Sequence, residues 1–319
     1  MTKPIILDCD PGNDDALGIL VAAGHKALDL KAVTTGAGHL AGDRTARNGA
    51  IVLAVAGRDD VPVSAGAMEP LVRERLIAGI LDQTSALDPE RPDLEAVTLD
   101  PRHSSDLIAD LALSGAASTV VTTGPLTNLA LALRRNPRLP PKIERIVSLG
   151  GAWGLGNKTA AAEWNVLCDP EAAAIVFGAG IPVTLVPIDV GPQAVITDRL
   201  IADAGAVGGR VGPFAAELLR SLKATFRQGV FGPAAMPLND PVASLVAAEP
   251  SLARTVPARV EVELAGKFTY GRTVIDFAGR SGPPNAEIAV ELDGEGIHAA
   301  FIAALKRLAS RPDRRGEEV

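Results

Sequence analysis

Near the start of the chain stands the stretch Ile5-Ile6-Leu7-Asp8-Cys9-Asp10-Pro11-Gly12-Asn13-Asp14-Asp15-Ala16. Its apolar residues 5–7 predict a short buried strand, and the apolar-rich residues that follow predict a helix over Asp14–Ala23. Pro11 and Gly12 predict the turn between the two. Ligands of open parallel sheets bind at the carboxyl ends of strands, so aspartates at this turn indicate an α/β protein with its site there.

The same alternation of short apolar runs and alanine- and leucine-rich stretches continues along the chain. We therefore predict an α/β fold in one domain, residues 1–319, with a mostly parallel, mixed central sheet flanked by helices, similar to a Rossmann fold. The expected strands are Ile5–Leu7, Leu30–Thr35, Thr119–Thr122, Arg145–Leu149 and Pro182–Pro187, and the expected helices are Asp14–Ala23, Arg44–Ala56, Asp106–Leu113, Leu126–Arg134 and Pro170–Phe177.

The last part of the chain has a different pattern. Three β-like runs, Arg259–Leu264, Arg272–Asp276 and Glu287–Leu292, follow one another without long helices between them. They predict an antiparallel extension of the sheet, closed by a helix over Ile297–Leu308. The polar residues 311–319 predict a frayed tail.

The bulk composition argues against several classes of partner. The formal net charge is −7, whereas nucleic acids and anionic membranes attract basic proteins. Two cysteines, Cys9 and Cys168, are too few for a disulfide scaffold. We find no signal peptide and no apolar run long enough to cross a membrane. We expect a cytoplasmic protein whose partner is a small molecule.

The aspartates of the first stretch predict a metal site. Asp8 and Asp10 project to the same side of an extended strand, and the turn brings Asp14 and Asp15 back towards them. So many carboxylates cannot stay ionised together without a cation. Hard oxygen ligands favour Ca²⁺ or Mg²⁺ over zinc, and a crowd of them at a flexible turn favours Ca²⁺. The alternative, in which Asp14 and Asp15 cap the helix, accounts for only part of the cluster.

The order of motifs along nearly the whole chain resembles the nucleoside hydrolase family, the inosine-uridine-preferring hydrolases and their relatives. The first motif is Asp-x-Asp-Pro-Gly-x-Asp-Asp over residues 8–15. Each motif alone is weak, but their joint order and spacing are specific. The others are Val33–Thr35 with Gly38, Thr123–Ala130, Leu149–Gly151, Gly156–Asn157, Ala162–Asn165, Asp169–Ala172, Asn239–Pro241 and Gly271–Asp276.

This resemblance implies an N-ribohydrolase, which cleaves the N-glycosidic bond of ribonucleosides to free base and ribose through an oxocarbenium-like transition state. It implies a Ca²⁺ ion, a water on that ion activated by Asp10 as general base, and a homodimer or homotetramer. The implied metal ligands are Asp10, Asp15, the backbone carbonyl of Thr123, and Asp240, and the implied ribose-binding residues are Asp14, Asn157, Glu163 and Asn165.

The base-binding side departs from the family pattern. Asn239 stands where many members have a histidine that helps to protonate the leaving base, and an amide is no acid at neutral pH. His39 stands where the family has asparagine, and we expect it beside the sugar. Residues 71–79 replace a His-Gly-x-x-Gly-like loop. The expected base pocket comprises Leu149, Trp153 and Asn239.

Three explanations of these departures stay open. His39 acts as the acid, or Trp153 or Trp164 stacks on a purine and polarises it, or the substrate is another N-ribosyl compound. Two alternatives to an N-ribohydrolase also stay open. One is a non-catalytic nucleoside- or ribose-binding protein, because Asn239 cannot act as an acid. The other is a Mg²⁺ phosphatase with an aspartyl nucleophile, although the chain lacks a glycine-rich phosphate loop with lysine.

Overall fold

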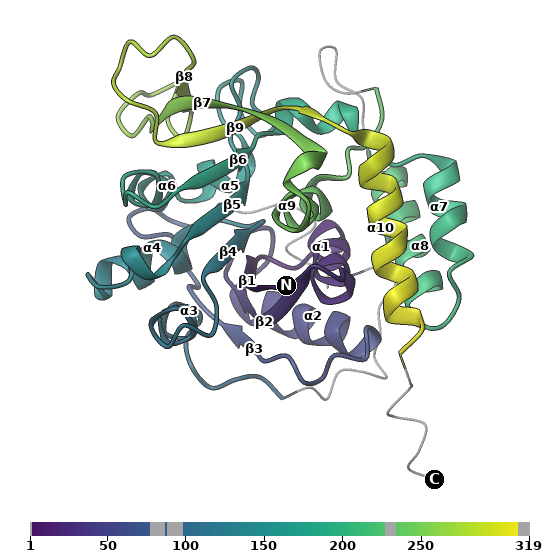
Figure 1. Cartoon of the computed structure of the whole chain (residues 1–319). Coiled ribbons are helices and arrows are strands. Elements are labelled where there is room, and N and C mark those ends of the chain that lie inside the picture. Colours follow the sequence, from purple (N-terminus) through teal and green to yellow (C-terminus); the bar gives the residue numbers. More distant parts are fainter. Residues whose placement is uncertain (1, 77–86, 88–97, 227–233, 312–319) are drawn as a thin grey trace.

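The computed structural model describes residues 2–76, 87, 98–226 and 234–311 (Figure 1). Strands and helices alternate along most of this part of the chain. The strands are β1 (Lys3–Cys9), β2 (Leu28–Thr35), β3 (Val63–Ala65), β4 (Thr119–Thr122), β5 (Arg145–Leu149), β6 (Val183–Val186), β7 (Ala253–Val262), β8 (Thr273–Asp276) and β9 (Ala286–Leu292). The α-helices are α1 (Asn13–Gly24), α2 (Gly42–Val55), α3 (Ser104–Leu113), α4 (Thr127–Arg135), α5 (Trp164–Cys168), α6 (Pro170–Phe177), α7 (Asp198–Gly205), α8 (Val211–Thr225), α9 (Asn239–Ala248) and α10 (Gly294–Ala309), and short 3₁₀ turns are η3 (Pro140–Lys142), η4 (Ile188–Gln193) and η5 (Pro250–Leu252).

The strands form one sheet in the order β3-β2-β1-β4-β5-β6-β9-β7-β8. Neighbouring strands from β3 to β9 pair in parallel, whereas β7 pairs antiparallel with both β9 and β8. The predicted mixed, mostly parallel sheet is therefore confirmed. The strand order reverses between β1 and β4, because β2 and β3 lie on one side of β1 while β4, β5 and β6 lie on the other. Loops that leave the two sides of such a switch point diverge, and the crevice between them admits ligands.

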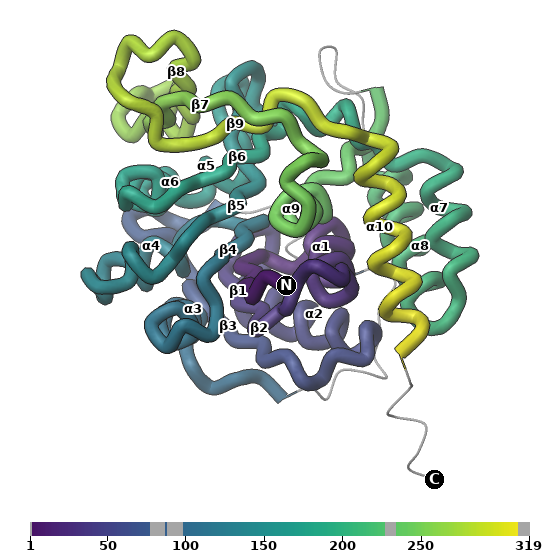
Figure 2. The backbone as a smooth tube through the Cα atoms, viewed as in Figure 1, coloured from purple at the N-terminus to yellow at the C-terminus, as the bar shows by residue number. Residues whose placement is uncertain are grey.

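The first strand shows why helices cover both faces of the sheet. Ile5, Leu7 and Cys9 pack into one hydrophobic core, and Ile6 packs into a second one. The first core lies under α1, α2, α7, α8, α9 and α10, and the second under α3, α4 and α6. Figure 1 shows these two groups of helices on opposite faces of the sheet, and Figure 2 shows α10 running alongside α7 and α8. A strand buried on both faces reads as a continuous apolar run, as this one does.

Several predicted elements have the bounds that the sequence indicated. The strands Thr119–Thr122 and Arg145–Leu149 and the helix Pro170–Phe177 are β4, β5 and α6. The other predicted strands and helices are confirmed with ends that differ by at most three residues, except that β7 begins at Ala253, six residues before the predicted Arg259. Helix α10 starts three residues before the predicted Ile297, because the Asp293 side chain accepts a hydrogen bond from the Gly296 N–H at 3.0 Å and caps the helix.

Five of the described strands and α-helices were not predicted: β3, α5, α7, α8 and α9. β3 and α5 have only three and five residues, too few for a periodic pattern. Gly208 and Gly209 stand between α7 and α8, and Pro213 lies in the first turn of α8. These residues are typical of loops, so they conceal the helical pattern around them.

The C-terminal extension is antiparallel as predicted, with one difference. β7 pairs antiparallel with its two neighbours, but β9 pairs in parallel with β6 and so belongs to the main sheet. The predicted frayed tail, apart from Arg311, and residues 77–79 of the segment that departs from the family pattern lie outside the described residues. Across the described ranges, no helix is long and apolar enough to cross a membrane.

Candidate active site

Polar residues gather where β1 and β4 end. The two strands are neighbours, so Asp10 after β1 and Thr123 after β4 emerge side by side at the switch point. The turn at residues 11–12 leads into α1, whose first turn carries Asp14 and Asp15. The sequence pattern thus placed this cluster at the correct edge of the sheet.

A cavity of about 200 Å³ opens at this point. Its wall comes from the loops after five parallel strands and from the start of α9, so residues far apart in the sequence face one another. The described residues that line it are Asp10, Asp14, Asp15, His39, Thr123, Leu149, Asn157, Glu163, Trp164, Asn165, Ile188, Met236, Asn239 and Asp240.

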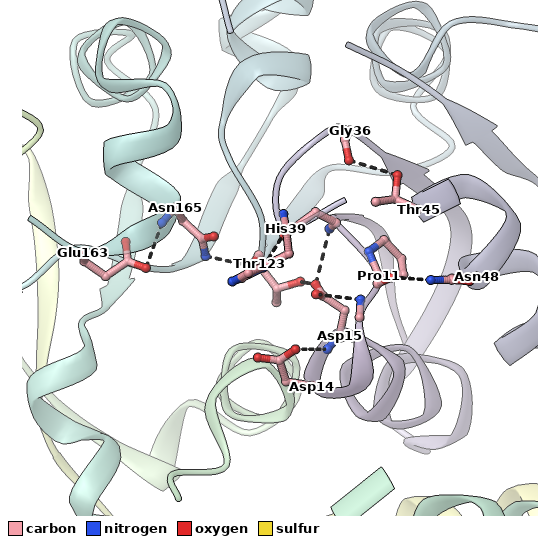
Figure 3. A network of polar contacts seen from close by, with 12 residues as sticks. Pro11, Asp14, Asp15, Gly36, His39, Thr45, Asn48, Thr123, Glu163 and Asn165 are labelled. Carbon is pink, nitrogen blue, oxygen red and sulfur yellow. Dashed lines mark hydrogen bonds and ion pairs between the residues drawn. The ribbon is translucent and has the colours of Figure 1, made fainter. Parts of the chain in front are cut away.

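The Asp15 carboxylate ties the first loop to the neighbouring strand. Its Oδ1 accepts a hydrogen bond from the Thr123 hydroxyl at 2.8 Å. The Asp10 N–H and the Gly12 N–H approach Oδ1 and Oδ2, both at 3.4 Å. The Thr123 N–H in turn donates to the Asp8 carbonyl at 2.9 Å. Figure 3 shows the contacts of the Asp15 carboxylate, with Asp14 beside it at the start of the same helix.

Asp10 is held from three sides. Its Oδ2 accepts hydrogen bonds from the His39 backbone N–H at 2.8 Å and from His39 Nδ1 at 3.0 Å. A Cβ at Gly124 would lie 2.6 Å from Asp10 Oδ1, and one at Gly38 would overlap Oδ2. Only glycine therefore fits at these two positions beside the carboxylate.

The residues present fit a divalent cation with hard oxygen ligands. Among the described residues, Asp14, Asp15 and Asp240 form a cluster in which one ligand oxygen from each lies within 4.8 Å of the others. Burial raises the pKa of all three carboxyls, and the charges of neighbouring carboxylates raise those of Asp15 and Asp240 further. A cation at this place offsets that repulsion. Asp10 lines the same cavity, with its Oδ2 engaged by His39.

The opposite wall carries amide and carboxylate groups. Asn165 Nδ2 donates to the Thr123 carbonyl at 2.8 Å, and Figure 3 shows this side chain reaching across to Thr123. Glu163 caps α5 and accepts three backbone N–H bonds, from Gly151 and Asn165 at 2.8 Å and from Val166 at 3.1 Å. Burial nevertheless raises the Glu163 pKa. A carboxylate has about four lone-pair positions, so Glu163 keeps one for a further donor.

His39 joins this cavity to an aromatic wall. Its ring stacks on Trp164 with the centroids 4.4 Å apart and the planes 13° from parallel. Burial lowers the His39 pKa, but the hydrogen bond to Asp10 and the carboxylates around it outweigh burial and raise the pKa to about 9. Lys158 Nζ also lies over the Trp164 ring, 4.6 Å from its centroid. Trp164 is therefore a packed wall and not an open platform.

Asp8, which we grouped with the other aspartates of the first stretch, does not line the cavity. Its Oδ1 accepts hydrogen bonds from the Thr34 hydroxyl at 2.8 Å and from Asn128 Nδ2 at 2.9 Å. Burial raises its pKa to about 7. Asn128 Nδ2 also donates to the Thr35 carbonyl at 3.1 Å, and its Oδ1 accepts a hydrogen bond from the Ala67 N–H at 2.9 Å, so this buried amide ties together β1, β2 and the segment that follows β3. Cys9 points away from the carboxylates into the first core.

Of the metal-binding, ribose-binding and base-pocket residues that the family resemblance implied, with His39, all except Trp153 line the cavity. The ring of Trp153 packs edge-on against Phe277, with the centroids 5.8 Å apart, and Trp153 does not line the cavity. The cavity in turn includes Ile188 and Met236, which sequence reasoning missed. An isolated apolar residue in a loop or a short 3₁₀ turn carries no signal of its own, so only the strand order could have placed these two.

Comparisons with known proteins agree with this geometry. A sequence model described as inosine-uridine preferring nucleoside hydrolase matches residues 5–299. The pyrimidine-specific ribonucleoside hydrolase RihA of Shigella flexneri is 42% identical over 310 residues, covering 96% of this chain and 99% of that protein. RihA of Salmonella arizonae is 43% identical over 312 residues, with the same coverage.

Solved structures show the same fold. A plant nucleoside hydrolase, PpNRh1, has a TM-score of 0.87 and 29% identity, covering 98% of this chain and 100% of that one. A purine-preferring ribonucleoside hydrolase from Gardnerella vaginalis has a TM-score of 0.88 and 28% identity, covering 96% and 99%.

Proposed function

Because the chain belongs to the inosine-uridine preferring nucleoside hydrolase family and is a nucleoside N-ribohydrolase, we propose that it cleaves pyrimidine ribonucleosides with Ca²⁺ bound at its aspartate cluster. The observation that carries the proposal is the cavity in which Asp14, Asp15 and Asp240 face the amide and carboxylate groups of Asn165 and Glu163. Membership of this family of hydrolases decides against the two alternatives that the sequence had left open, a Mg²⁺ phosphatase and a non-catalytic nucleoside- or ribose-binding protein.

Two observations support a preference for pyrimidine over purine bases. The relatives that are 42–43% identical are named as pyrimidine-specific, whereas the purine-preferring hydrolase from Gardnerella vaginalis is 28% identical. The cavity of about 200 Å³ is also small beside the roughly 300–1,000 Å³ of sites for drug-sized ligands. A small cavity favours the smaller base.

The environment of Trp164 argues against the stacked-purine explanation. His39 stacks on this ring, Lys158 Nζ lies over it and the residue is only 6% exposed, whereas Trp153 lies outside the cavity wall. Neither tryptophan therefore offers the open face that a purine needs. Asn239 lines the cavity and can donate a hydrogen bond from its amide to a carbonyl of the leaving base, although it cannot supply a proton.

The chain's own groups have distinct tasks in the proposed reaction. Ca²⁺ would orient the ribose diol and polarise the attacking water. Asp10 accepts the proton of that water, while His39 holds its Oδ2 in place. The surrounding carboxylates stabilise the positive charge that develops on the sugar as the glycosidic bond breaks.

Ribose recognition falls to Asp14, Asn157, Glu163 and Asn165. Glu163 and Asn165 are buried, Asp14 is half-buried and Asn157 is exposed, and all four line one cavity with hydrogen-bond acceptors and donors. A sugar that lacks one hydroxyl would leave one of them without a partner, which costs about 1–3 kcal/mol. We therefore expect 2′-deoxyribonucleosides to be cleaved about 10–100-fold less efficiently than ribonucleosides.

The direct test is release of free base and reducing sugar from uridine, cytidine, inosine and adenosine. The protein is first treated with a chelator and then supplied with Ca²⁺, with Mg²⁺ or with no ion. We expect turnover of the two pyrimidine nucleosides that Ca²⁺ restores. Faster turnover of inosine than of uridine would refute the base preference, and full activity after chelation would refute the role of the ion.

A further inference from the structure

The loop of residues 150–162 contributes to the wall of the cavity. It follows β5, carries Asn157 on the cavity wall and ends at Glu163. Two of its glycines have a positive φ, +145° at Gly150 and +68° at Gly151, a backbone conformation that other residues rarely adopt. A loop with this backbone has no regular hydrogen-bond ladder, so outside groups must hold its shape.

Thr273, at the start of β8, holds the first part of this loop. Its hydroxyl accepts a hydrogen bond from the Ala152 N–H at 2.8 Å and donates one to the Ala152 carbonyl at 2.7 Å. The residue is 2% exposed. A Cβ at Gly151 would lie 2.8 Å from Thr273 Cγ2, so the loop and the strand are in close contact here.

Arg272, the residue before Thr273, holds the middle and the end of the loop. Its Nη2 donates to the Trp153 carbonyl at 2.9 Å, and its Nη1 donates to the carbonyls of Gly154 at 3.1 Å and Ala161 at 3.4 Å. The Asp189 carboxylate binds the N–H groups of two of these residues. It accepts hydrogen bonds from the Trp153 N–H at 3.0 Å and from the Gly154 N–H at 2.9 Å. The loop is thus fixed through its carbonyls by Arg272 and through its N–H groups by Asp189.

The clamped loop in turn holds the cavity groups. The Gly151 N–H donates to Glu163 Oε2 at 2.8 Å. Gly151 directly precedes Ala152, whose backbone Thr273 binds. Asn157 Oδ1 accepts the Trp164 N–H at 2.9 Å, next to the Glu163 cap of α5. A shift of the loop therefore moves both Glu163 and Asn157.

The segment that bears Arg272 is itself anchored on the body of the protein. Gly271 has a φ of +78°, and a Cβ there would lie 2.8 Å from Leu167 Cδ1 in α5. The Tyr270 hydroxyl donates to the Glu171 carboxylate of α6, at 2.8 Å from Oε2. The hairpin of β7 and β8 is thus a support with its own contacts to the sheet and to two helices.

We propose that Arg272 and Thr273 are positioning residues for the ribose: they clamp the loop of residues 150–162 and so set the places of Asn157 and Glu163. Neither residue lines the cavity. The proposal rests on the proposed ribose-binding role of Asn157 and Glu163. It assigns a catalytic consequence to a hairpin that lies at the far end of the sheet from β3 (Figure 1).

The test compares Arg272→Met, Arg272→Lys and Thr273→Val with the wild type and with Arg259→Met. Arg259 is the matched control, because it lies on the same hairpin and its guanidinium binds the exposed Glu261 instead of the loop. Three quantities are measured on the full chain: hydrogen exchange of the loop amides by mass spectrometry, kcat and KM for uridine, and the rise in melting temperature on adding Ca²⁺.

We expect Arg272→Met and Thr273→Val to speed exchange in residues 150–162 and to lower kcat/KM by about 10–100-fold, since small misplacements of binding groups cost rates of this order. Arg272→Lys should retain part of the activity, because an ammonium can bind one or two of the three carbonyls. The Ca²⁺-dependent rise in melting temperature should be unchanged, because the aspartate cluster lies on α1 and α9 and not on the clamped loop. Arg259→Met should match the wild type in all three measurements.

Unchanged exchange in the loop would overturn the clamp. Faster exchange with kcat/KM within about twofold of the wild type would show a purely structural role and overturn the positioning role. A wild-type protein that does not cleave uridine would contradict the proposed substrate, while the exchange data would still decide whether the clamp exists.

Discussion

Replacing Asp240 by asparagine should change the stability of the protein in opposite directions with and without a bound ion. Asp240 is 3% exposed and stands with Asp14 and Asp15 in the cluster whose ligand oxygens lie within 4.8 Å of one another. Asparagine keeps the shape of the side chain and removes its charge. It therefore removes repulsion from the ion-free protein and a ligand from the ion-bound one.

The magnitude follows from the separation. Two unit charges 4.8 Å apart repel by about 3 kcal/mol at an effective dielectric constant of about 20, and Asp240 has two such neighbours. Partial protonation relieves some of this repulsion, so we expect Asp240→Asn to stabilise the chelated protein by about 2 kcal/mol at pH 8. In a chain of this length that corresponds to a rise of about 3 °C in melting temperature.

The pH dependence has a definite sign. Burial, followed by the neighbouring carboxylates, raises the pKa of Asp15 and Asp240 above the ordinary value of 3.8. The folded protein then binds more protons than the unfolded chain, so the stability that is present below about pH 4 is lost as the pH rises. The melting temperature of the chelated wild type should fall between about pH 5 and pH 8, and the increment due to Ca²⁺ should grow over the same range.

The assay is thermal unfolding of the wild type, Asp240→Asn and Asp43→Asn, each with chelator and with saturating Ca²⁺. Asp43 is the matched control, an exposed carboxylate in the first turn of α2 whose loss costs at most about 1 kcal/mol. Asp240→Asn should melt higher than the wild type in chelator and gain much less from Ca²⁺. A lower melting temperature in chelator, or an undiminished gain from Ca²⁺, would refute the reasoning.

Three further predictions concern single residues. Asp10→Asn should lower kcat by about 10²–10⁴-fold, the usual contribution of a general base, while calorimetry still detects uridine binding; a loss below tenfold would rule Asp10 out as the base. The chain has two tryptophans, so uridine should change the fluorescence of Trp153→Phe, which keeps Trp164 at the cavity, and leave that of Trp164→Phe unchanged; the reverse pattern would place the substrate elsewhere. Asn128→Ala removes three buried hydrogen bonds and should cost about 3 kcal/mol, seen as a drop of about 4 °C in melting temperature; a drop below 1 °C would contradict the tie between the strands.

The sequence alone determined the fold class and the location of the site. Runs that are apolar on both faces, such as Ile5–Leu7, identify strands buried in a parallel sheet, and the stretches between them identify covering helices. Polar residues mark the ends of two strands, because Asp10 directly follows β1 and Thr123 directly follows β4. Parallel strands present their carboxyl ends at one edge, so these local patterns were enough to bring the first aspartates together.

The wall of the cavity was decided only by the tertiary structure. No local pattern distinguishes Trp164, which lines the cavity, from Trp153, which packs against Phe277. The contact between His39 and Asp10, and the arrival of Asp240 beside Asp15, depend on the order of strands in the sheet. Strand order is a property of packing between distant segments, and the side-chain periodicity of one segment carries no information about which segment becomes its neighbour.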